Sequence, residues 1–372
     1  MDHFACPFFS KIKYMQVRYA LFFVLMAVIV SCTEKNDHQT DIDQKTKIFS
    51  RRISDDNPNF IIFEMDDSYD PSFFEWTFPG DVKITNKPTM VYYFEKQGSY
   101  AVNLKMETAN GKMSYTETVT IPHNSVYYNN NESLYWSDEF NDPKLNSTDW
   151  NYDMGIEKWG NNELQEYTNS TNNSFVRDGK LVIRTNKRGT GQKIGDYTSA
   201  RVTTNGKIEI NRGRVEVRAK LGGGKGLWPA IWLFGRNASP YYSELDIMEY
   251  VGFDKNRVYA AVHTSHTLEG NEKVSGFKDI DDVESHFHTY GINWTDHKVD
   301  FYIDSPENIY LTFIPKDKTS PAHWPFDKNL YLILNVAVGG DWAGMQGVDD
   351  NIFPQETEFE YVRIFQKKNQ IG

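Results

Sequence analysis

Apolar and polar residues alternate with a period of two along most of the chain, which is the pattern of β-strands that bury one face. Over residues 60–121 the alternating runs are short and are interrupted by Gly, Asn and Pro, as in Tyr100-Ala-Val-Asn-Leu-Lys-Met and Tyr115-Thr-Glu-Thr-Val-Thr-Ile. Such runs predict antiparallel strands joined by tight turns. We therefore predict a small β-sandwich over residues 56–122.

A second, larger unit follows a polar segment with four Asn, residues 122–132, of which we assign 123–132 to a linker. The period of two returns in runs such as Leu181-Val-Ile-Arg-Thr and Val299-Asp-Phe-Tyr-Ile-Asp, and no long amphipathic helix interrupts it. Strands with frequent turn signals predict one large two-sheet sandwich over residues 133–368. The fold class is thus all-β, and the length of 372 residues suits two folded units.

The beginning of the chain has the order of features that marks a secretory signal. Basic residues between positions 11 and 18 precede eleven consecutive apolar residues at 20–30, a basic n-region followed by an apolar h-region. Such a run is too short to span a bilayer. We predict a signal peptide over residues 1–31, with an uncleaved anchor as the alternative.

The end of that run, Val28-Ile-Val-Ser-Cys32, resembles a bacterial lipobox, which implies that Cys32 becomes the lipidated first residue of the mature protein. A simple signal peptide without lipidation stays open. We assign residues 32–55 to a polar tether and expect the protein at the outer membrane, on its periplasmic face or on the cell surface. Contact with the membrane is expected through this lipid anchor alone.

Charge and cysteine content exclude several classes of protein. The net charge of -11 and the pI of about 5.4 argue against nucleic acid as a partner, because phosphates are bound by clustered Lys and Arg. Aromatic residues make up 15% of the chain, which suits stacking on a neutral polysaccharide. The two cysteines, Cys6 and Cys32, both precede the folded part, so core burial rather than a disulfide must stabilise it. We expect a monomer.

Three acidic residues interrupt an otherwise apolar strand, Ser243-Glu-Leu-Asp-Ile-Met-Glu-Tyr-Val-Gly252. In a regular strand Glu244 and Asp246 share one face, whereas Glu249 points to the other. One extra residue around Ile247-Met248, a β-bulge, returns Glu249 to the face of the other two. The carboxyl groups can then approach the separation of about 5–5.5 Å that retaining glycosidases use.

Crowding of three carboxylates raises the pKa of at least one of them and keeps a proton available for a leaving group. The alternatives are a solvated strand face or a Ca²⁺ site. Acidic residues are poor strand formers, and the neighbouring Leu245, Ile247 and Met248 assign the opposite face to the core. We therefore interpret the acidic face as a catalytic site.

The segment Glu244-Leu-Asp-Ile-Met-Glu249 resembles the bulged Glu-x-Asp-x-x-Glu signature of glycoside hydrolase family 16. Other segments between residues 131 and 367 resemble the laminarinase branch of that family, in the family's order: Trp136-Ser-Asp-Glu-Phe-Asn141, Trp159-Gly-Asn-Asn-Glu-Leu-Gln165, Tyr197-Thr-Ser-Ala-Arg201, Gly226-Leu-Trp-Pro-Ala-Ile-Trp232, Trp324-Pro-Phe326 and Leu334-Asn-Val-Ala-Val-Gly-Gly340. The resemblance implies a β-jelly-roll fold. It also implies that Glu244 is the nucleophile, Glu249 the acid/base and Asp246 an assisting carboxylate.

The smaller unit has a resemblance of its own. Residues 74–81 and 93–104 are similar to the immunoglobulin-like PKD module found beside many secreted carbohydrate-active enzymes. The resemblance implies a spacer or a weak glycan-binding module, and both readings stay open.

Five residues around the trio are candidates for contact with sugar. Trp228 and Trp232 can stack on glucose rings or pack in the core. His263 can reach the leaving group or serve as a structural histidine. By the resemblance, Asn161 and Arg201 match family positions that contact sugar hydroxyls, although turn and strand residues with internal hydrogen bonds look the same in sequence.

The chain departs from the family pattern in two places. Laminarinases usually carry Trp-Pro-x-x-Gly before the first catalytic Glu, whereas this chain has Ser239-Pro-Tyr-Tyr-Ser243, which leaves the subsite nearest the nucleophile open. Their closing strand often reads Asp-Tyr-Val-Arg-Val-Tyr and supplies an acid to a structural Ca²⁺, whereas here it reads Glu360-Tyr-Val-Arg-Ile-Phe365. Glu139 and Glu360 are therefore candidate ligands of a structural Ca²⁺, while the chemistry itself requires no cofactor.

The sequence thus predicts a glycoside hydrolase, an endo-acting and retaining β-1,3-glucanase (laminarinase-like) or mixed-linkage β-glucanase that works by double displacement. The alternatives are a family 16 hydrolase of a galactan, agar or carrageenan, and a non-catalytic glycan-binding lipoprotein. Trp228 and Trp232 favour a glucan. The acidic trio favours catalysis, because desolvated carboxylates do not help to capture a neutral sugar.

Overall fold

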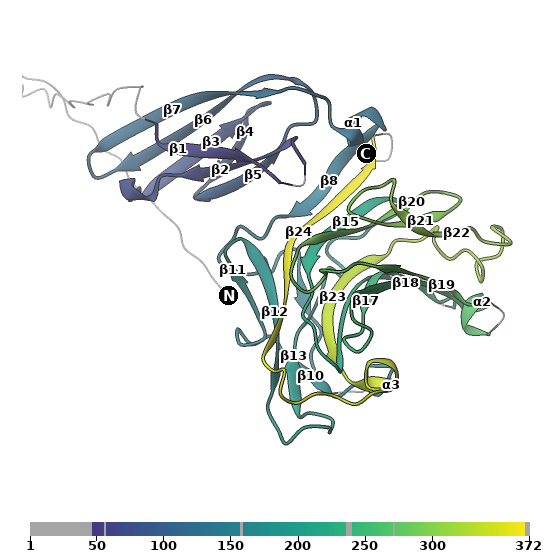
Figure 1. The fold of residues 1–372 in the computed structure, drawn as a ribbon. Coiled ribbons are helices and arrows are strands. Elements are labelled where there is room, and N and C mark those ends of the chain that lie inside the picture. Colours follow the sequence, from purple (N-terminus) through teal and green to yellow (C-terminus); the bar gives the residue numbers. More distant parts are fainter. Residues whose placement is uncertain (1–46, 56, 157–158, 236–239, 271, 369–372) are drawn as a thin grey trace, which may run out of the picture. The chain divides into compact units, whose positions relative to one another are not determined.

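The computed structural model describes residues 47–55, 57–156, 159–235, 240–270 and 272–368. Cys32, the predicted signal peptide and most of the predicted tether lie outside the described residues. The described chain forms two β-sandwiches that follow one another in the sequence (Figure 1). None of the helices in this part of the chain has the length and apolar character that crossing a bilayer requires.

The N-terminal sandwich consists of a three-stranded sheet, in the order β1-β2-β5, and a four-stranded sheet, in the order β4-β3-β6-β7. Its elements are β1 (Phe49–Ile53), β2 (Phe60–Met65), the 3₁₀-helix η1 (Asp67–Tyr69), β3 (Phe73–Phe78), β4 (Val82–Thr85), β5 (Thr89–Tyr93), β6 (Gly98–Thr108) and β7 (Gly111–Ile121). Alternate residues of the strands form its core, where Phe63, Trp76 and Leu104 are fully buried. The predicted small β-sandwich is confirmed, whereas its likeness to a PKD module stays a prediction.

This sandwich begins before residue 56, inside the segment that we predict as a tether. Strand β1 pairs with β2, and Ile48 and Phe49 are buried in the core. The Phe49 ring meets the Trp76 ring edge-on at a centroid distance of 5.0 Å. Only the first residue of β1 is buried, so the strand shows no alternation that the sequence could reveal.

The predicted linker is packed rather than free. It contains the short helix α1 (Val126–Asn129). The Tyr127 ring stacks on Phe365 with centroids 3.8 Å apart, and its hydroxyl donates to Glu216 at 2.8 Å. These contacts fix the segment against the C-terminal strand. The Asn-rich composition of the segment gives no sign of this packing.

The C-terminal sandwich consists of a ten-stranded and a seven-stranded sheet. The ten-stranded sheet follows the path β10-β13-β12-β24-β15-β20-β21-β22, with β11 beside β12 and β8 beside β24, and the seven-stranded sheet has the order β19-β18-β17-β16-β23-β14-β9. The strands are β8 (Glu132–Asp138), β9 (Asn151–Tyr152), β10 (Gln165–Tyr167), β11 (Ser174–Arg177), β12 (Lys180–Lys187), β13 (Tyr197–Ser199), β14 (Arg201–Thr203), β15 (Gly213–Lys220), β16 (Leu227–Phe234), β17 (Ser243–Tyr250), β18 (Arg257–Thr264), β19 (Val274–Asp279), β20 (His288–Trp294), β21 (Val299–Ile303), β22 (Ile309–Phe313), β23 (Tyr331–Val338) and β24 (Gln355–Lys367). The connections contain the one-turn helices α2 (Ser265–Leu268) and α3 (Gly340–Ala343).

The core of the larger sandwich lies between these two sheets. Val217 and Ile292 from the ten-stranded sheet and Leu245 and Leu334 from the seven-stranded sheet are fully buried there. A sheet that buries one face leaves the other for polar side chains. The predicted all-β jelly-roll sandwich is confirmed, and β17 of the seven-stranded sheet carries the acidic trio.

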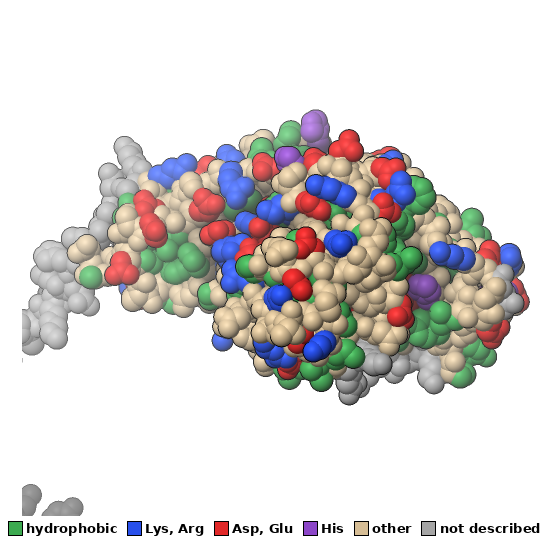
Figure 2. Space-filling view, turned by 60° about the horizontal axis from the view of Figure 1, so that its bottom comes forward, with side chains coloured by type: hydrophobic (Ala, Val, Ile, Leu, Met, Phe, Trp, Pro, Cys, Tyr) green, Lys and Arg blue, Asp and Glu red, His purple; other side chains and the backbone are tan. Residues whose placement is uncertain are grey.

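Charges on the surface are mixed. Figure 2 shows acidic and basic side chains interspersed over one face of the molecule. A nucleic-acid-binding face instead gathers Lys and Arg. On this face the distribution agrees with the net charge of -11 in pointing away from a polyanionic partner.

Candidate active site

The pairing of β17 with its neighbours contains an irregularity in the middle of the acidic segment. Asp246 pairs with Ala261 on β18, but the next paired residue on β17 is Glu249, opposite Tyr259. Three steps along β17 therefore match two steps along β18, which means that β17 contains one extra residue. The predicted β-bulge is confirmed, and the pairing of β17 with β16 shifts at the same place.

The bulge sends both residues between the last two carboxylates into the core. Ile247 and Met248 are 1% and 0% exposed and belong to the core between the sheets. The Ile247 carbonyl accepts a hydrogen bond from the Tyr310 hydroxyl of β22 at 3.3 Å, which satisfies a backbone group where the ladder is irregular. Glu249 thereby returns to the face of the other two carboxylates.

His263 lies opposite Glu244 on β18 and contacts two members of the trio. Its Nε2 is 3.2 Å from Asp246 Oδ2 and 3.9 Å from Glu244 Oε1. In the described part of the chain these three residues are the only acidic and His side chains that crowd closely enough, within 4.8 Å, for a shared metal ion. The imidazole and the carboxylates already pair with one another, so their proximity needs no ion to explain it.

Glu249 has the environment of a proton donor. Burial raises the pKa of Glu249 well above its ordinary value, and the charges of Asp246 and Glu244 raise it further. The charge of His263 and the Trp228 indole N–H, which donates to Glu249 Oε1 at 3.1 Å, offset only part of this rise. Glu249 therefore keeps its proton at a pH where a solvated Glu has lost it, as a general acid must.

Glu244 has more partners that favour its ionised form. Burial raises the pKa of Glu244, but the Tyr242 hydroxyl, which donates to Oε2 at 2.7 Å, and the charges of His263 and Arg201 lower it. The pKa of Asp246 lies well above its ordinary value because of burial and the charge of Glu244. Two glutamates in unequal environments can divide the roles of nucleophile and acid between them.

Trp228 and Trp232 lie on β16, and both of their indole N–H groups are engaged. Trp228 is 9% exposed, donates to Glu249 and meets the Trp342 ring edge-on at 5.3 Å. Trp232 is partly exposed and donates to Asn335 Oδ1 at 2.7 Å. Most of the Trp228 side chain is therefore packed against other protein side chains. Contact of either ring with sugar stays a prediction.

Arg201 and Asn161 make internal contacts. The Arg201 guanidinium lies between two indoles, 4.7 Å from the Trp232 centroid and 5.1 Å from that of Trp159. Asn161 is exposed, and its backbone and side-chain N–H groups donate to Glu163 at 2.9 and 3.5 Å. The charge of Arg201 lowers the pKa of Glu244. The Asn161 carbonyl accepts a hydrogen bond from the Asp341 backbone N–H at 2.7 Å. Sugar binding by Arg201 and Asn161 remains a prediction.

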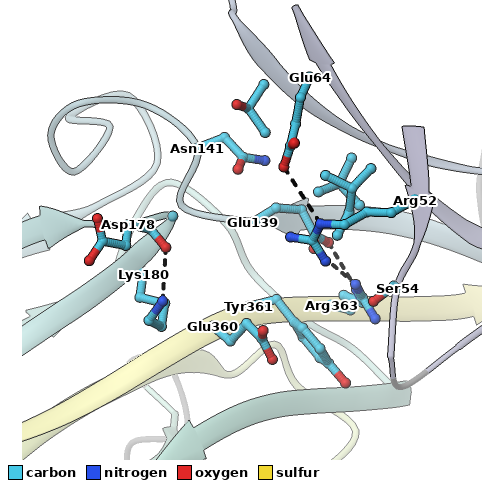
Figure 3. A pocket seen from close by; sticks show the side chains of 14 residues that line it. Arg52, Ser54, Glu64, Glu139, Asn141, Asp178, Lys180, Glu360, Tyr361 and Arg363 are labelled. Atoms are coloured by element: carbon cyan, nitrogen blue, oxygen red, sulfur yellow. Dashed lines mark hydrogen bonds and ion pairs between the residues drawn. The ribbon is translucent and has the colours of Figure 1, made fainter. Parts of the chain in front are cut away.

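The predicted Ca²⁺ ligands lie elsewhere, in a pocket of about 310 Å³ that both line (Figure 3). Arg363 donates two hydrogen bonds of 2.9 Å to the Glu139 carboxylate, and Arg218 donates to Glu360 at 2.6 Å. Lys180 lines the same pocket. Ca²⁺ binds about six to eight oxygen ligands, whereas these carboxylates are neutralised by arginines. The pair therefore does not fit a Ca²⁺ site.

The structure adds three residues to the surroundings of the trio. Tyr242 donates to Glu244, Asn335 accepts from Trp232, and Trp342 packs on Trp228. The period of two already puts Tyr242 on the face of Glu244, so this signal is present in the sequence. Asn335, 103 positions from Trp232, and Trp342 reach the site only because β23 pairs with β16.

Comparison with known proteins adds independent information. The sequence of residues 161–362 matches the family model of the glycosyl hydrolases family 16. A beta-glucanase from Rhodothermus marinus is 39% identical over 246 residues, which cover 62% of this chain and 84% of that protein. A glucan endo-1,3-beta-glucosidase from Cryptopygus antarcticus is 34% identical over 253 residues, which cover 62% of this chain and 90% of that protein. The crystal structure of a laminarinase from Flavobacterium sp. UMI-01 is 41% identical with a TM-score of 0.57, and the match covers 63% of this chain and 100% of that one.

The raised pKa of Glu249 predicts that Glu249→Gln stabilises the protein at pH 8. A carboxyl group whose pKa rises on folding contributes stability below its ordinary pKa and loses it as the pH rises through the raised value. The neutral amide avoids this loss, so the free energy of unfolding should exceed that of the wild type by about 1–3 kcal/mol at pH 8 and by less at pH 4. Denaturant unfolding at both pH values measures the difference.

Glu216→Gln is the matched control. Glu216 is 3% exposed and burial raises its pKa too, but the charge of Arg214 and hydrogen bonds from Tyr127 at 2.8 Å and Tyr302 at 2.7 Å offset part of the rise. Its replacement should destabilise the protein, because breaking a buried pair leaves the partner charge uncompensated. A Glu249→Gln effect that is destabilising, or equal at the two pH values, would contradict the assigned environment of Glu249.

Proposed function

The chain belongs to glycosyl hydrolase family 16, and on this basis we propose that it is a retaining endo-β-glucanase of β-1,3-glucan (laminarin type) or mixed-linkage β-glucan. The observation that carries the proposal is the bulge in β17, which gathers Glu244, Asp246 and Glu249 on one face in unequal environments. The substrate class is supported by the relatives, which are named as a beta-glucanase, a glucan endo-1,3-beta-glucosidase and a laminarinase.

The first step transfers the glycan to the enzyme. Glu249 gives its proton to the glycosidic oxygen while the bond from that oxygen to the anomeric carbon breaks, and the Glu244 carboxylate attacks the same carbon from the opposite side. The released sugar departs with a new hydroxyl group, and an ester joins Glu244 to the remaining glycan. The raised pKa of Glu249 favours the protonated form that supplies this proton.

The second step releases the glycan. Glu249, now ionised, takes a proton from a water molecule whose oxygen attacks the anomeric carbon, and Glu244 leaves as a carboxylate. Both groups return to their starting protonation states. Two inversions at one carbon retain its configuration, and the steps use only side chains and water, so no cofactor takes part.

Asp246 acts through its neighbours. It is 5% exposed and lies 3.2 Å from His263 Nε2. Its negative charge contributes to the raised pKa of Glu249. Asp246 therefore helps to keep the proton on the acid without bonding to the sugar, and His263 holds the Asp246 carboxylate in place.

The aromatic surroundings of the site favour a glucan over a galactan. The partly exposed Trp232 ring, backed by the Arg201 guanidinium at 4.7 Å, is suited to an apolar sugar face. Burying and crowding carboxylates costs free energy, and a non-catalytic glycan binder gains nothing from it.

We further propose that a lipid on Cys32 anchors the monomeric protein at the outer membrane and that the N-terminal sandwich is a PKD-like spacer or weak glycan binder. The likeness of residues 28–32 to a lipobox supports the anchor. Cys32→Ser should move the protein from the membrane to the soluble fraction after cell fractionation. A Cys32→Ser protein that stays with the membrane would exclude the lipid as its anchor.

Hydrolysis of laminarin, lichenan, curdlan, agarose and carrageenan in parallel tests the activity. We expect reducing sugar from laminarin or lichenan and none from the two galactans, since the relatives and the aromatic site both point to glucan. Release from agarose or carrageenan alone would overturn the substrate class, and no release from any polymer by the folded protein would overturn the assignment as an enzyme.

Variants in the same assay test the residues. Glu244→Gln and Glu249→Gln should each reduce kcat by about 10²–10⁴-fold or more, and Asp246→Asn should reduce it less. Glu360→Gln makes the same chemical change at a glutamate that pairs with Arg218 and should leave kcat unchanged. A folded Glu244→Gln or Glu249→Gln protein with wild-type turnover would show that the site is wrongly assigned.

A further inference from the structure

Tyr242 lies two residues before Glu244, on the face that carries the acidic trio. It directly precedes β17, and the strand period of two places it on the same face as Glu244. Its hydroxyl donates a hydrogen bond of 2.7 Å to Glu244 Oε2. The mechanism described so far assigns no task to this residue.

Two further contacts hold the Tyr242 ring. The backbone N–H donates to Ser265 Oγ, at the start of α2, at 2.9 Å. The ring meets Phe234 of β16 edge-on, with centroids 5.5 Å apart and an interplanar angle of 72°. Contacts with β16 and α2 therefore determine where the hydroxyl lies, so it is a preorganised donor rather than a mobile one.

The hydrogen bond distinguishes the two oxygens of Glu244. Oε2 accepts from Tyr242, whereas Oε1 lies on the side of His263, 3.9 Å from its Nε2. A carboxylate that is held at one oxygen has a fixed plane and presents the other oxygen to a substrate. A donor also stabilises the ionised form of the group that accepts from it, against the effect of burial.

The other charged groups around Glu244 come from three strands. Asp246 and Glu249 lie on β17 itself, His263 on β18 and Arg201 on β14, while β16 contributes the apolar Phe234. Among the residues that the structure describes, Tyr242 is the group that donates a hydrogen bond to Glu244. The charges of His263 and Arg201 also lower the pKa of Glu244, whereas burial raises it.

We propose that Tyr242 is a positioning residue that orients Glu244 with Oε1 toward the anomeric carbon and keeps it ionised for attack. This inference rests on the proposed function, because it assigns Glu244 the role of nucleophile. Tyr242 touches the reacting atoms only through Glu244. Its effect should therefore appear in the pH dependence of the reaction more than in the binding of glucan.

Tyr242→Phe keeps the ring and removes only the donor, and Tyr241→Phe is the matched control at a neighbouring ring that is 38% exposed. The measurement is the pH profile of kcat/KM on the glucan that the wild type hydrolyses. In Tyr242→Phe the acidic limb should move to higher pH by about one unit, so that kcat/KM falls about tenfold on that limb. KM should change little, and Tyr241→Phe should follow the wild type.

A Tyr242→Phe profile whose acidic limb stays in place would overturn the claim that Tyr242 keeps Glu244 ionised, and a profile that coincides with the wild type at every pH would overturn the orienting role as well. If Tyr242→Phe does not fold, 3-fluorotyrosine at position 242 keeps both ring and hydroxyl and makes the hydroxyl a stronger donor. The acidic limb should then move to lower pH, and an unmoved limb would overturn the proposal equally. Failure of the wild type to hydrolyse any β-glucan would instead refute the proposed function, so the two failures are distinguishable.

Discussion

One inserted residue in β17 is the constraint on which the site depends. A strand of uninterrupted period two points Glu249 into the core that Leu245 and Val262 occupy. The bulge instead sends Ile247 and Met248 into that core and returns Glu249 to the polar face. Tyr310 donates to the Ile247 carbonyl from the opposite sheet, so the packing of the two sheets and the geometry of the carboxylates are fixed together.

Burial then converts this geometry into chemistry. The apolar sandwich beneath the trio raises the pKa of all three carboxyl groups, which costs stability, and their mutual repulsion adds to the effect on Asp246 and Glu249. The two glutamates accept hydrogen bonds from different donors. Glu249 accepts from the Trp228 indole N–H, and Glu244 accepts from the Tyr242 hydroxyl. A site that retains such unfavourable charges is a common compromise between stability and activity.

Local patterns were sufficient for the class of fold, for the bulge and for the acidic trio, because all three depend on strand period and on neighbours within ten residues. Contacts between distant segments were not predictable in this way. Arg363 neutralises Glu139 across 224 positions, which removes the predicted Ca²⁺ ligand, and Tyr127 of the polar linker finds its partner on β15. Strand β1 buries a single residue and therefore has no alternation that predicts it, whereas the spacing of Tyr242 from Glu244 is visible in the sequence.

The configuration of the first product tests the central claim most directly. If the bulge brings Glu244 and Glu249 together at short range, no water fits between the base and the anomeric carbon, and Glu244 must attack that carbon itself. Proton NMR during early hydrolysis of a β-glucan, before mutarotation, should then show the β-anomer of the new reducing end first. Initial release of the α-anomer would mean a single inversion and a wider separation of the carboxyl groups, and would contradict the account of the site.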